Sequence, residues 1–349
     1  MPAEEAMRTH HIFLTISVLS IFLFFSCSKN ARIAEQRMEE VVVYAYDSFI
    51  SEWGAGPAIA KGFEAKTGYT LTFVNCGDAA QVLSKAILEN GNPQSDMLLG
   101  IDNNIAQKAR DENVLEQYKP LHADEIISDE LRDALGGDWM LTPYDYSKFA
   151  LIYDTYASVP APKSLADLTK PVYAKKLILM DPRMSTPGLG FAAWTVAFFG
   201  NEYESYWRKL KSAILTMSPG WSSGYGLFTK GEAPLVISYV TSPAYHVYAD
   251  NSTRYKALVF DEGHVQQVEG AGITKGAANS KGAKAFLDYL ISDEAQSELP
   301  IGQWMYPVNK NVVLPDCYAI TLDDELKTLS YDGAVVAEAV TTIAAILAE

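Results

Sequence analysis

Short apolar runs alternate with helical segments from residue 41 onward, and this alternation restricts the fold more than any other feature. The apolar runs predict strands at residues 41–46, 71–74, 97–99, 149–153, 177–180, 235–239 and 265–273. The intervening segments predict helices at residues 58–67, 80–89, 188–199, 202–212, 283–291, 293–298 and 334–347. Strands separated by helices are typical of mostly parallel sheets covered by helices. The sequence therefore predicts an α/β protein.

The length of 349 residues leaves room for two lobes around separate cores. Strands near residues 143–150 and 265–275 are expected to cross between them. We expect lobe I to comprise residues 41–145 plus about 270–349, and lobe II to comprise residues 146–269. This arrangement would gather the strand-to-helix corners around one cleft, where ligands of open α/β sheets bind.

The N-terminal segment predicts export. Arg8 precedes an apolar run at residues 12–25, which is short for a membrane span but suits a signal peptide. A small residue followed by Cys27 is similar to a bacterial lipoprotein signal. We expect residues 1–27 to be the signal, residues 28–40 a polar tether, and Cys27 an acylation site that holds a periplasmic protein at a membrane. An uncleaved anchor helix is the alternative.

Charge and chemistry favour a binding protein. A net charge of −15 excludes most nucleic-acid binders and suits a cationic ligand or a solubilising surface. His122, His246 and His264 lack metal-ligand spacing, so no metal or cofactor is expected. Two alternatives stay open: a ferric site that includes Tyr239 and Tyr245, and a nucleophilic role for Cys76.

The segment from Met180 to Gly190 is the strongest local indication of a ligand site. A buried strand ends there, and Ser185 and Thr186 precede Pro187, a combination typical of a helix start. The unpaired N–H groups of such a start can hold an anion or a polar ligand.

Further polar and aromatic residues gather at strand ends and helix starts. The polar corners are Tyr46-Asp47-Ser48, Gly77-Asp78-Ala79, Asp102-Asn103-Asn104, Trp221-Ser222-Ser223 and Tyr239 to Ser242. The aromatic residues outside periodic apolar faces are Tyr46, Trp53, Trp221, Tyr239, Tyr245 and Trp304. Such rings could hold a flat or cationic heteroaromatic ligand by stacking and cation–π contact.

Many short motifs in the same order resemble the periplasmic thiamine-binding proteins of bacterial ABC importers, over about residues 41–310. They include Tyr46-Asp-Ser-Phe49, Gly100-Ile-Asp-Asn-Asn104, Asp181-Pro-Arg183, Ser185-Thr-Pro-Gly-Leu-Gly190, Thr241-Ser-Pro-Ala-Tyr-His246 and Trp304-Met-Tyr-Pro307. The resemblance implies a two-lobed type 2 periplasmic-binding-protein fold with the ligand in the interlobe cleft. It also implies thiamine as ligand, delivery to a membrane permease with its ATPase, and no catalysis.

The resemblance also implies which residues contact the ligand. The expected contacts are Asp78, Ala79, Ser185, Thr186, Trp221, Tyr239, Val240, Thr241 and Ser242. The expected aromatic walls are Tyr46, Trp53, Tyr245 and Trp304.

Two departures from the family pattern bear on specificity. Ala79 stands where the family has glycine, and Cys76-Gly77 replaces a Leu-Glu pair. Ala79 could narrow the space for a phosphate, so the choice among thiamine, its monophosphate and its diphosphate stays open. Cys76 leaves a thiaminase-like enzyme as an alternative, because thiaminase I resembles this fold and uses a cysteine. A related solute-binding protein for ferric ion or polyamine is a further alternative.

Overall fold

The computed structural model describes residues 39–321 and 326–349. The expected signal segment, Cys27 and most of the expected tether lie outside the described residues. Within the described part of the chain, no helix is both long and apolar enough to cross a bilayer.

Eleven strands form one mixed sheet whose main path has the order β2-β1-β3-β10-β5-β8-β6-β7. The strands on this path are β1 (Glu40–Ala45), β2 (Thr70–Asn75), β3 (Met97–Asp102), β5 (Thr142–Asp154), β6 (Leu177–Met180), β7 (Ile214–Ser218), β8 (Leu235–Tyr239) and β10 (Gln266–Thr274). The short strands beside it are β4 (Leu115–Glu116), β9 (Tyr255–Ala257) and β11 (Tyr306–Pro307).

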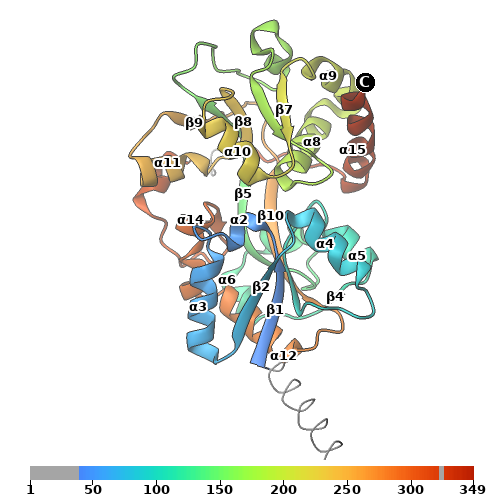
Figure 1. Ribbon diagram of the computed structural model, residues 1–349, viewed down its shortest axis with the longest axis vertical. Helices are drawn as coiled ribbons and strands as arrows, with labels where there is room; N and C mark the ends of the chain where they lie inside the picture. Colours follow the sequence, from blue (N-terminus) through green and yellow to red (C-terminus); the bar gives the residue numbers. More distant parts are fainter. Residues whose placement is uncertain (1–38, 322–325) are drawn as a thin grey trace, which may run out of the picture.

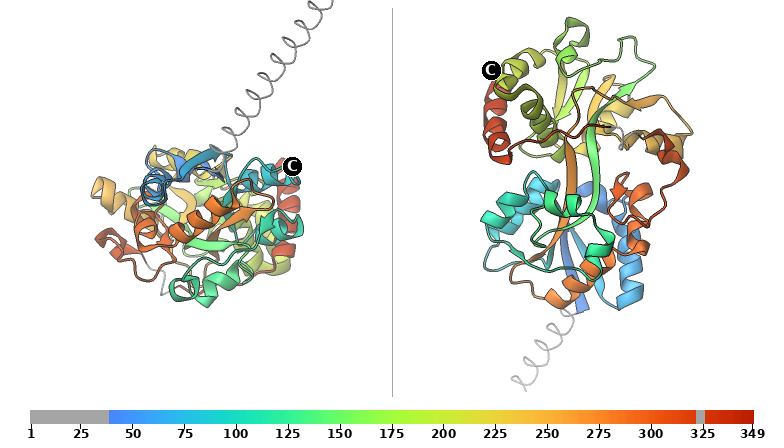
Figure 2. Two further views of the ribbon diagram at one scale, coloured as in Figure 1. Left: turned by 90° about the horizontal axis from the view of Figure 1, so that it is seen from below. Right: turned by 180° about the vertical axis from the view of Figure 1, so that it is seen from behind.

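Helices cover the sheet on both sides (Figures 1 and 2). The longer ones are α3 (Gly56–Thr67), α4 (Ala79–Leu88), α8 (Thr186–Phe199), α9 (Tyr203–Leu210), α10 (Trp221–Thr229), α11 (Ser242–Asp250), α12 (Ser280–Leu290) and α15 (Gly333–Ala348). The shorter ones are α2 (Asp47–Ile50), α5 (Ala106–Asp111), α6 (Ala123–Ile126), α7 (Asp129–Ala134), α13 (Asp293–Gln296) and α14 (Leu299–Gly302).

The molecule has two lobes, and this confirms the predicted fold class. Lobe I contains β1–β3 with α3, α4 and α12, and lobe II contains β6–β8 with α8–α11 (Figure 1). Strands β5 and β10 run between them: residues 142–148 of β5 pair with β10, whereas residues 149–153 pair with β8. A long strand shared by both lobes gives a hinge around which they can close.

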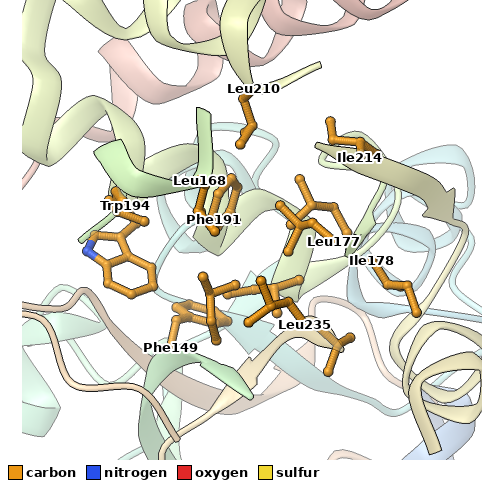
Figure 3. Close-up of a cluster of buried hydrophobic side chains, with 14 of the residues drawn as sticks. Phe149, Leu168, Leu177, Ile178, Phe191, Trp194, Leu210, Ile214 and Leu235 are labelled. Atoms are coloured by element: carbon orange, nitrogen blue, oxygen red, sulfur yellow. The ribbon is translucent and has the colours of Figure 1, made fainter. Parts of the chain in front are cut away.

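Each lobe has its own apolar core. Lobe I packs α3 and α12 against the sheet around Phe49, Phe63 and Phe286, all fully buried. In lobe II, Phe149 of β5, Leu177 of β6 and Trp194 of α8 belong to one buried apolar cluster (Figure 3). Two cores joined by β-strands let the lobes move without exposing either core, so the space between them can open to a ligand.

The C-terminal helix corrects the expected lobe boundary. Residues 270–349 were expected in lobe I, but α15 lies beside α8 and α9 of lobe II (Figure 1). Its apolar face inserts Val336, Ala339, Ile343 and Ile346 into the lobe II core, and each of these side chains is at most 2% exposed. The prediction assigned this helix to the wrong lobe because the sequence shows its apolar face but not which lobe buries that face.

Candidate ligand-binding site

A cavity of about 580 Å³ lies between the lobes. This volume falls in the range of small-molecule sites in proteins, about 300–1,000 Å³. The wall from lobe I and the adjoining strands and loops comprises Tyr46, Asp47, Ser48, Trp53, Asp78, Ala79, Glu269, Ile301, Gln303, Trp304 and Met305. The wall from lobe II comprises Thr186, Pro187, Trp221, Ser222, Tyr225, Gly226, Thr229, Tyr239, Ser242, Tyr245, Tyr248 and Ala249.

Ten of the thirteen residues predicted for the site line this cavity. They are Tyr46, Trp53, Asp78, Ala79, Thr186, Trp221, Tyr239, Ser242, Tyr245 and Trp304. The other three, Ser185, Val240 and Thr241, are at most 2% exposed and lie behind the wall. Thr241 turns its hydroxyl to Ser147 at 3.3 Å, because the chain reverses there between β8 and α11.

One aromatic wall is built around Trp221 at the start of α10. Its ring stacks on Tyr225 with centroids 4.9 Å apart and an interplanar angle of 20°. The ring of Trp53 lies on the lobe I side, and its centroid is 6.1 Å from that of Trp221. The indole N–H donates to the hydroxyl of Ser238 at 2.8 Å, and this bond fixes the orientation of the ring. A flat ligand can stack on a ring held in this way.

A second aromatic wall surrounds Trp304, which follows α14. Its ring packs against Tyr245 and Tyr248, both from α11, with ring centroids 5.3 Å and 5.6 Å away. The backbone of Trp304 has φ of +60°, a left-handed conformation that is unusual for a bulky residue. Such strained residues concentrate at ligand sites, where the surrounding structure holds them in place.

The predicted anion cradle at the start of α8 contains an anion from the protein itself. Asp78 Oδ1 accepts a bond from the backbone N–H of Thr186 at 3.3 Å and lies 3.4 Å from its hydroxyl. The same oxygen accepts from the N–H of Ala79 at 2.7 Å and so caps α4. Burial raises the pKa of Asp78. The carboxylate occupies the helix start that was expected to hold an anion or a polar group of the ligand.

The floor of the cavity contains Glu269, a residue that the sequence analysis missed. The hydroxyl of Tyr46 donates to Glu269 Oε2 at 2.5 Å, and the hydroxyl of Tyr144 donates to the same oxygen. Gln303 in turn donates to the Tyr46 oxygen at 2.9 Å. Burial raises the pKa of Glu269 to about 7, although the tyrosine bonds act in the opposite direction. The sequence signal that could have identified Glu269 is its position as a carboxylate inside the predicted strand at residues 265–273.

The wall of the cavity is acidic. Asp47, Asp78 and Glu269 contribute carboxyl groups, and no lysine or arginine is among the described residues that line it. Asp47 also accepts a bond from the hydroxyl of Ser222 at 3.4 Å, across the gap between the lobes. Because most of the other lining side chains are aromatic or aliphatic and the cavity is partly closed to water, these carboxyl groups act at a low effective dielectric constant. The arrangement favours a flat cation over an anion.

The sequence model of the family of bacterial extracellular solute-binding proteins matches residues 58–328 of the chain. The chain belongs to this family.

Within this family, the solute-binding protein described here is similar to curated thiamine-binding periplasmic proteins. That of Brucella melitensis is 39% identical over 79% of this chain and 81% of the relative. That of Salmonella typhimurium is 40% identical over 79% of this chain and 82% of the relative. A solved structure, a periplasmic thiamin binding protein, superposes with a TM-score of 0.81 at 34% identity over 89% of this chain and 96% of that one.

Relatives with other ligands share only the fold. The ferric binding protein from Campylobacter jejuni superposes with a TM-score of 0.72 at 18% identity, over 88% of this chain and 98% of that one. Among the described residues of this solute-binding protein, no group of three or more His, Cys, Asp or Glu side chains is arranged to hold a metal ion.

Cys76 does not line the cavity, and burial raises the pKa of its thiol. A raised pKa keeps the thiol protonated, which disfavours the nucleophile that a thiaminase-like enzyme would need.

Proposed function

We propose that this protein captures thiamine in the cleft between its lobes and delivers it intact to the membrane permease of an ABC importer. The observation that carries the proposal is the cavity itself, with aromatic rings on both lobes and carboxyl groups in its wall. Thiamine combines a flat aminopyrimidine with a positively charged thiazolium. Relatives 39–40% identical to this chain bear the name thiamine-binding periplasmic protein.

Each part of the cavity has a physical role in this proposal. The rings at Trp221 and Trp304 would hold the two heterocycles by stacking and cation–π contact, worth about 0.5–2 kcal/mol per ring. The carboxyl groups of Asp47, Asp78 and Glu269 would offset the positive charge. Closure of the lobes about β5 and β10 would exclude water and make the capture selective.

We also propose that the mature protein begins at Cys27 and that an acyl group on this cysteine holds it at a membrane. The apolar run at residues 12–25 and the small residue before Cys27 support this. Residues 28–40 would then tether the binding lobes close to the permease. Mass spectrometry of the protein purified from bacterial membranes would detect the lipid, and an unmodified Cys27 would contradict the anchor.

Calorimetric titration of residues 28–349 with thiamine, its monophosphate and its diphosphate tests the function. We expect saturable one-to-one binding of thiamine and its recovery unchanged after incubation. Ferric ion and spermidine serve as competitors and should not displace it. Failure to bind any of the three forms would refute the proposal. Release of free pyrimidine and thiazole, abolished in Cys76→Ser, would instead establish the enzyme.

A further inference from the structure

Glu269 has an unusual position in the hinge. It lies on β10, one of the two strands that join the lobes, and it also lines the cavity. The pairing of β10 with β5 shifts register between Glu269 and Gly270, and its pairing with β3 shifts between Gly270 and Ala271. Such bulges redirect a side chain next to functional sites. Here they accompany a carboxyl group placed at the cavity floor and only 6% exposed.

The side chains around Glu269 are arranged for a carboxylate anion. Its Oε2 accepts from the hydroxyls of Tyr46 and Tyr144, and its Oε1 accepts from the amide of Gln267 at 2.5 Å. A protonated carboxyl group would have its own hydrogen on one oxygen, so one of these three groups would have to reorient and stop donating to it. Hydrogen bonds of this kind stabilise the ionised form of a buried carboxyl group.

Asp145 opposes that ionisation. It faces Glu269 directly in the antiparallel pairing of β5 with β10, so both side chains lie on the same side of the sheet. Asp145 is 0% exposed, and neither of its carboxylate oxygens has a hydrogen-bond partner among the described residues. Burial and the charge of Glu269 raise the pKa of Asp145. Two adjacent buried carboxyl groups cannot both ionise without a cation nearby.

Among the described residues, the other elements packed around the floor supply no positive charge. Asp102 at the end of β3 and Asp78 at the start of α4 add negative charge that raises the pKa of Glu269. Tyr239 at the end of β8 is neutral, because burial raises its pKa further. Lys148 on β5 pairs with Gln266, three positions from Glu269, so it lies on the other face of the sheet.

We propose that Glu269 is the counter-ion for the positive charge of the ligand, and that capture of the ligand releases a proton from the Glu269–Asp145 pair. This inference rests on the proposed function, in which the ligand is the thiamine cation. A cation at the cavity floor stabilises the ionised form of Glu269, and the proton leaves to solvent. The pair therefore selects for a charged ring over a neutral ring of the same shape.

The proposal predicts a pH dependence of binding. Burial raises the pKa of the unliganded Glu269 to about 7. Below this pKa each bound ligand must displace a proton, so affinity falls about tenfold per pH unit, and above it affinity levels off. Thiamine should therefore bind about tenfold more weakly at pH 6 than at pH 8.

Calorimetry of the wild-type protein tests this without any substitution. Titrations at pH 6, 7 and 8 are repeated in buffers with different ionisation enthalpies, which reveals protons released on binding. We expect release at pH 6 and pH 7 that disappears at pH 8. Equal affinity at all three values, with no buffer-dependent heat, would overturn the counter-ion while leaving the proposed function intact. Absence of thiamine binding at every pH would refute the proposed function itself.

A matched pair of variants tests the assignment to Glu269. Glu269→Gln should lower thiamine affinity at pH 8 by about tenfold or more and abolish its pH dependence, on the scale of one lost buried charge. Its affinity for the neutral analogue with thiophene in place of thiazolium should change less than threefold. Glu232→Gln removes the same charge from an exposed loop and should bind both ligands like wild type. Equal losses for the charged and neutral ligands in Glu269→Gln would overturn the proposal.

Discussion

Asp78 of lobe I and Thr186 of lobe II meet across the cleft, with the Thr186 backbone N–H 3.3 Å from Asp78 Oδ1. Asp78 thus caps its own helix α4 and also occupies the positive end of the α8 dipole. The contact links the two lobes directly. It also places a negative charge where a phosphate of the ligand would otherwise bind.

Replacing Asp78 with asparagine should favour the phosphate esters of thiamine. Asparagine keeps an oxygen that can cap α4, but it removes the charge that repels a phosphate at the start of α8. We expect the affinity for thiamine monophosphate, relative to thiamine, to rise about fivefold or more, which corresponds to ~1 kcal/mol. Calorimetric titration with both ligands measures this ratio.

Asp47→Asn is the control for the Asp78 variant. It removes the same charge from the cavity wall, but Asp47 contacts Ser222 instead of the start of α8. The ratio of affinities should stay closer to wild type in this control. If both variants shift the ratio equally, the effect comes from the total charge of the cavity and not from the helix start.

Truncating Trp221 to alanine should weaken thiamine binding by about 1–3 kcal/mol, the scale of a lost stacking anchor. The ring lies on Tyr225 and is fixed by its bond to Ser238, so it is oriented before the ligand arrives. Trp221→Phe keeps an aromatic face and should lose less. Titration curves that match wild type in Trp221→Ala would remove this residue from the site.

The parts of the site that the sequence predicted are those with local indications. Ser185, Thr186 and Pro187 mark the start of α8 by their own chemistry, and α8 does begin at Thr186. The same reasoning treated Ser185 as a ligand contact, although its side chain is only 2% exposed and lies behind the wall. Local sequence predicts where a helix begins, but it does not show which of two adjacent side chains faces the cleft.

The parts that were missed depend on contacts between distant residues. Asp78 and Thr186 are 108 positions apart, so no local pattern indicates that one fills the helix start of the other. Glu269 meets Tyr46 and Tyr144 only because β10 lies between β3 and β5. The packing of α15 on lobe II is likewise set by the core that it covers. Tertiary pairing decided each of these features.

Gly190→Ala should destabilise the protein by about 1–3 kcal/mol, the usual cost of overpacking a core. A methyl group at this position would lie 2.2 Å from ring atoms of Phe149, where α8 packs closely on β5. The better helix propensity of alanine offsets only about 1 kcal/mol of this. Urea unfolding gives the free energy. Gly333→Ala, whose methyl group would have no neighbour within 4 Å, is the matched control and should be neutral or slightly stabilising.

The buried acid in the hinge should also make the stability of the unliganded protein depend on pH. Burial raises the pKa of Glu269 from its ordinary 4.5 to about 7, so between these values the folded protein holds more protons than the unfolded chain. Stability therefore rises as pH falls from 8 to 6.5, by about 1 kcal/mol for this one group. Asp102, whose pKa burial raises to about 6, acts in the same direction at lower pH.

Two buried histidines should oppose this rise below about pH 6.5. Burial lowers the pKa of His264 to about 4 and also lowers that of His246, so both stay neutral in the fold. Below their ordinary pKa of 6.5 the unfolded chain binds protons that the folded protein does not, and this lowers stability as pH falls. Urea unfolding at pH 6.5 and pH 8 should show the gain in wild type and little of it in Glu269→Gln. A wild-type protein that is more stable at pH 8 than at pH 6.5 would contradict this prediction. It would mean that Glu269 is already ionised in the empty cleft and therefore has no proton to release on unfolding.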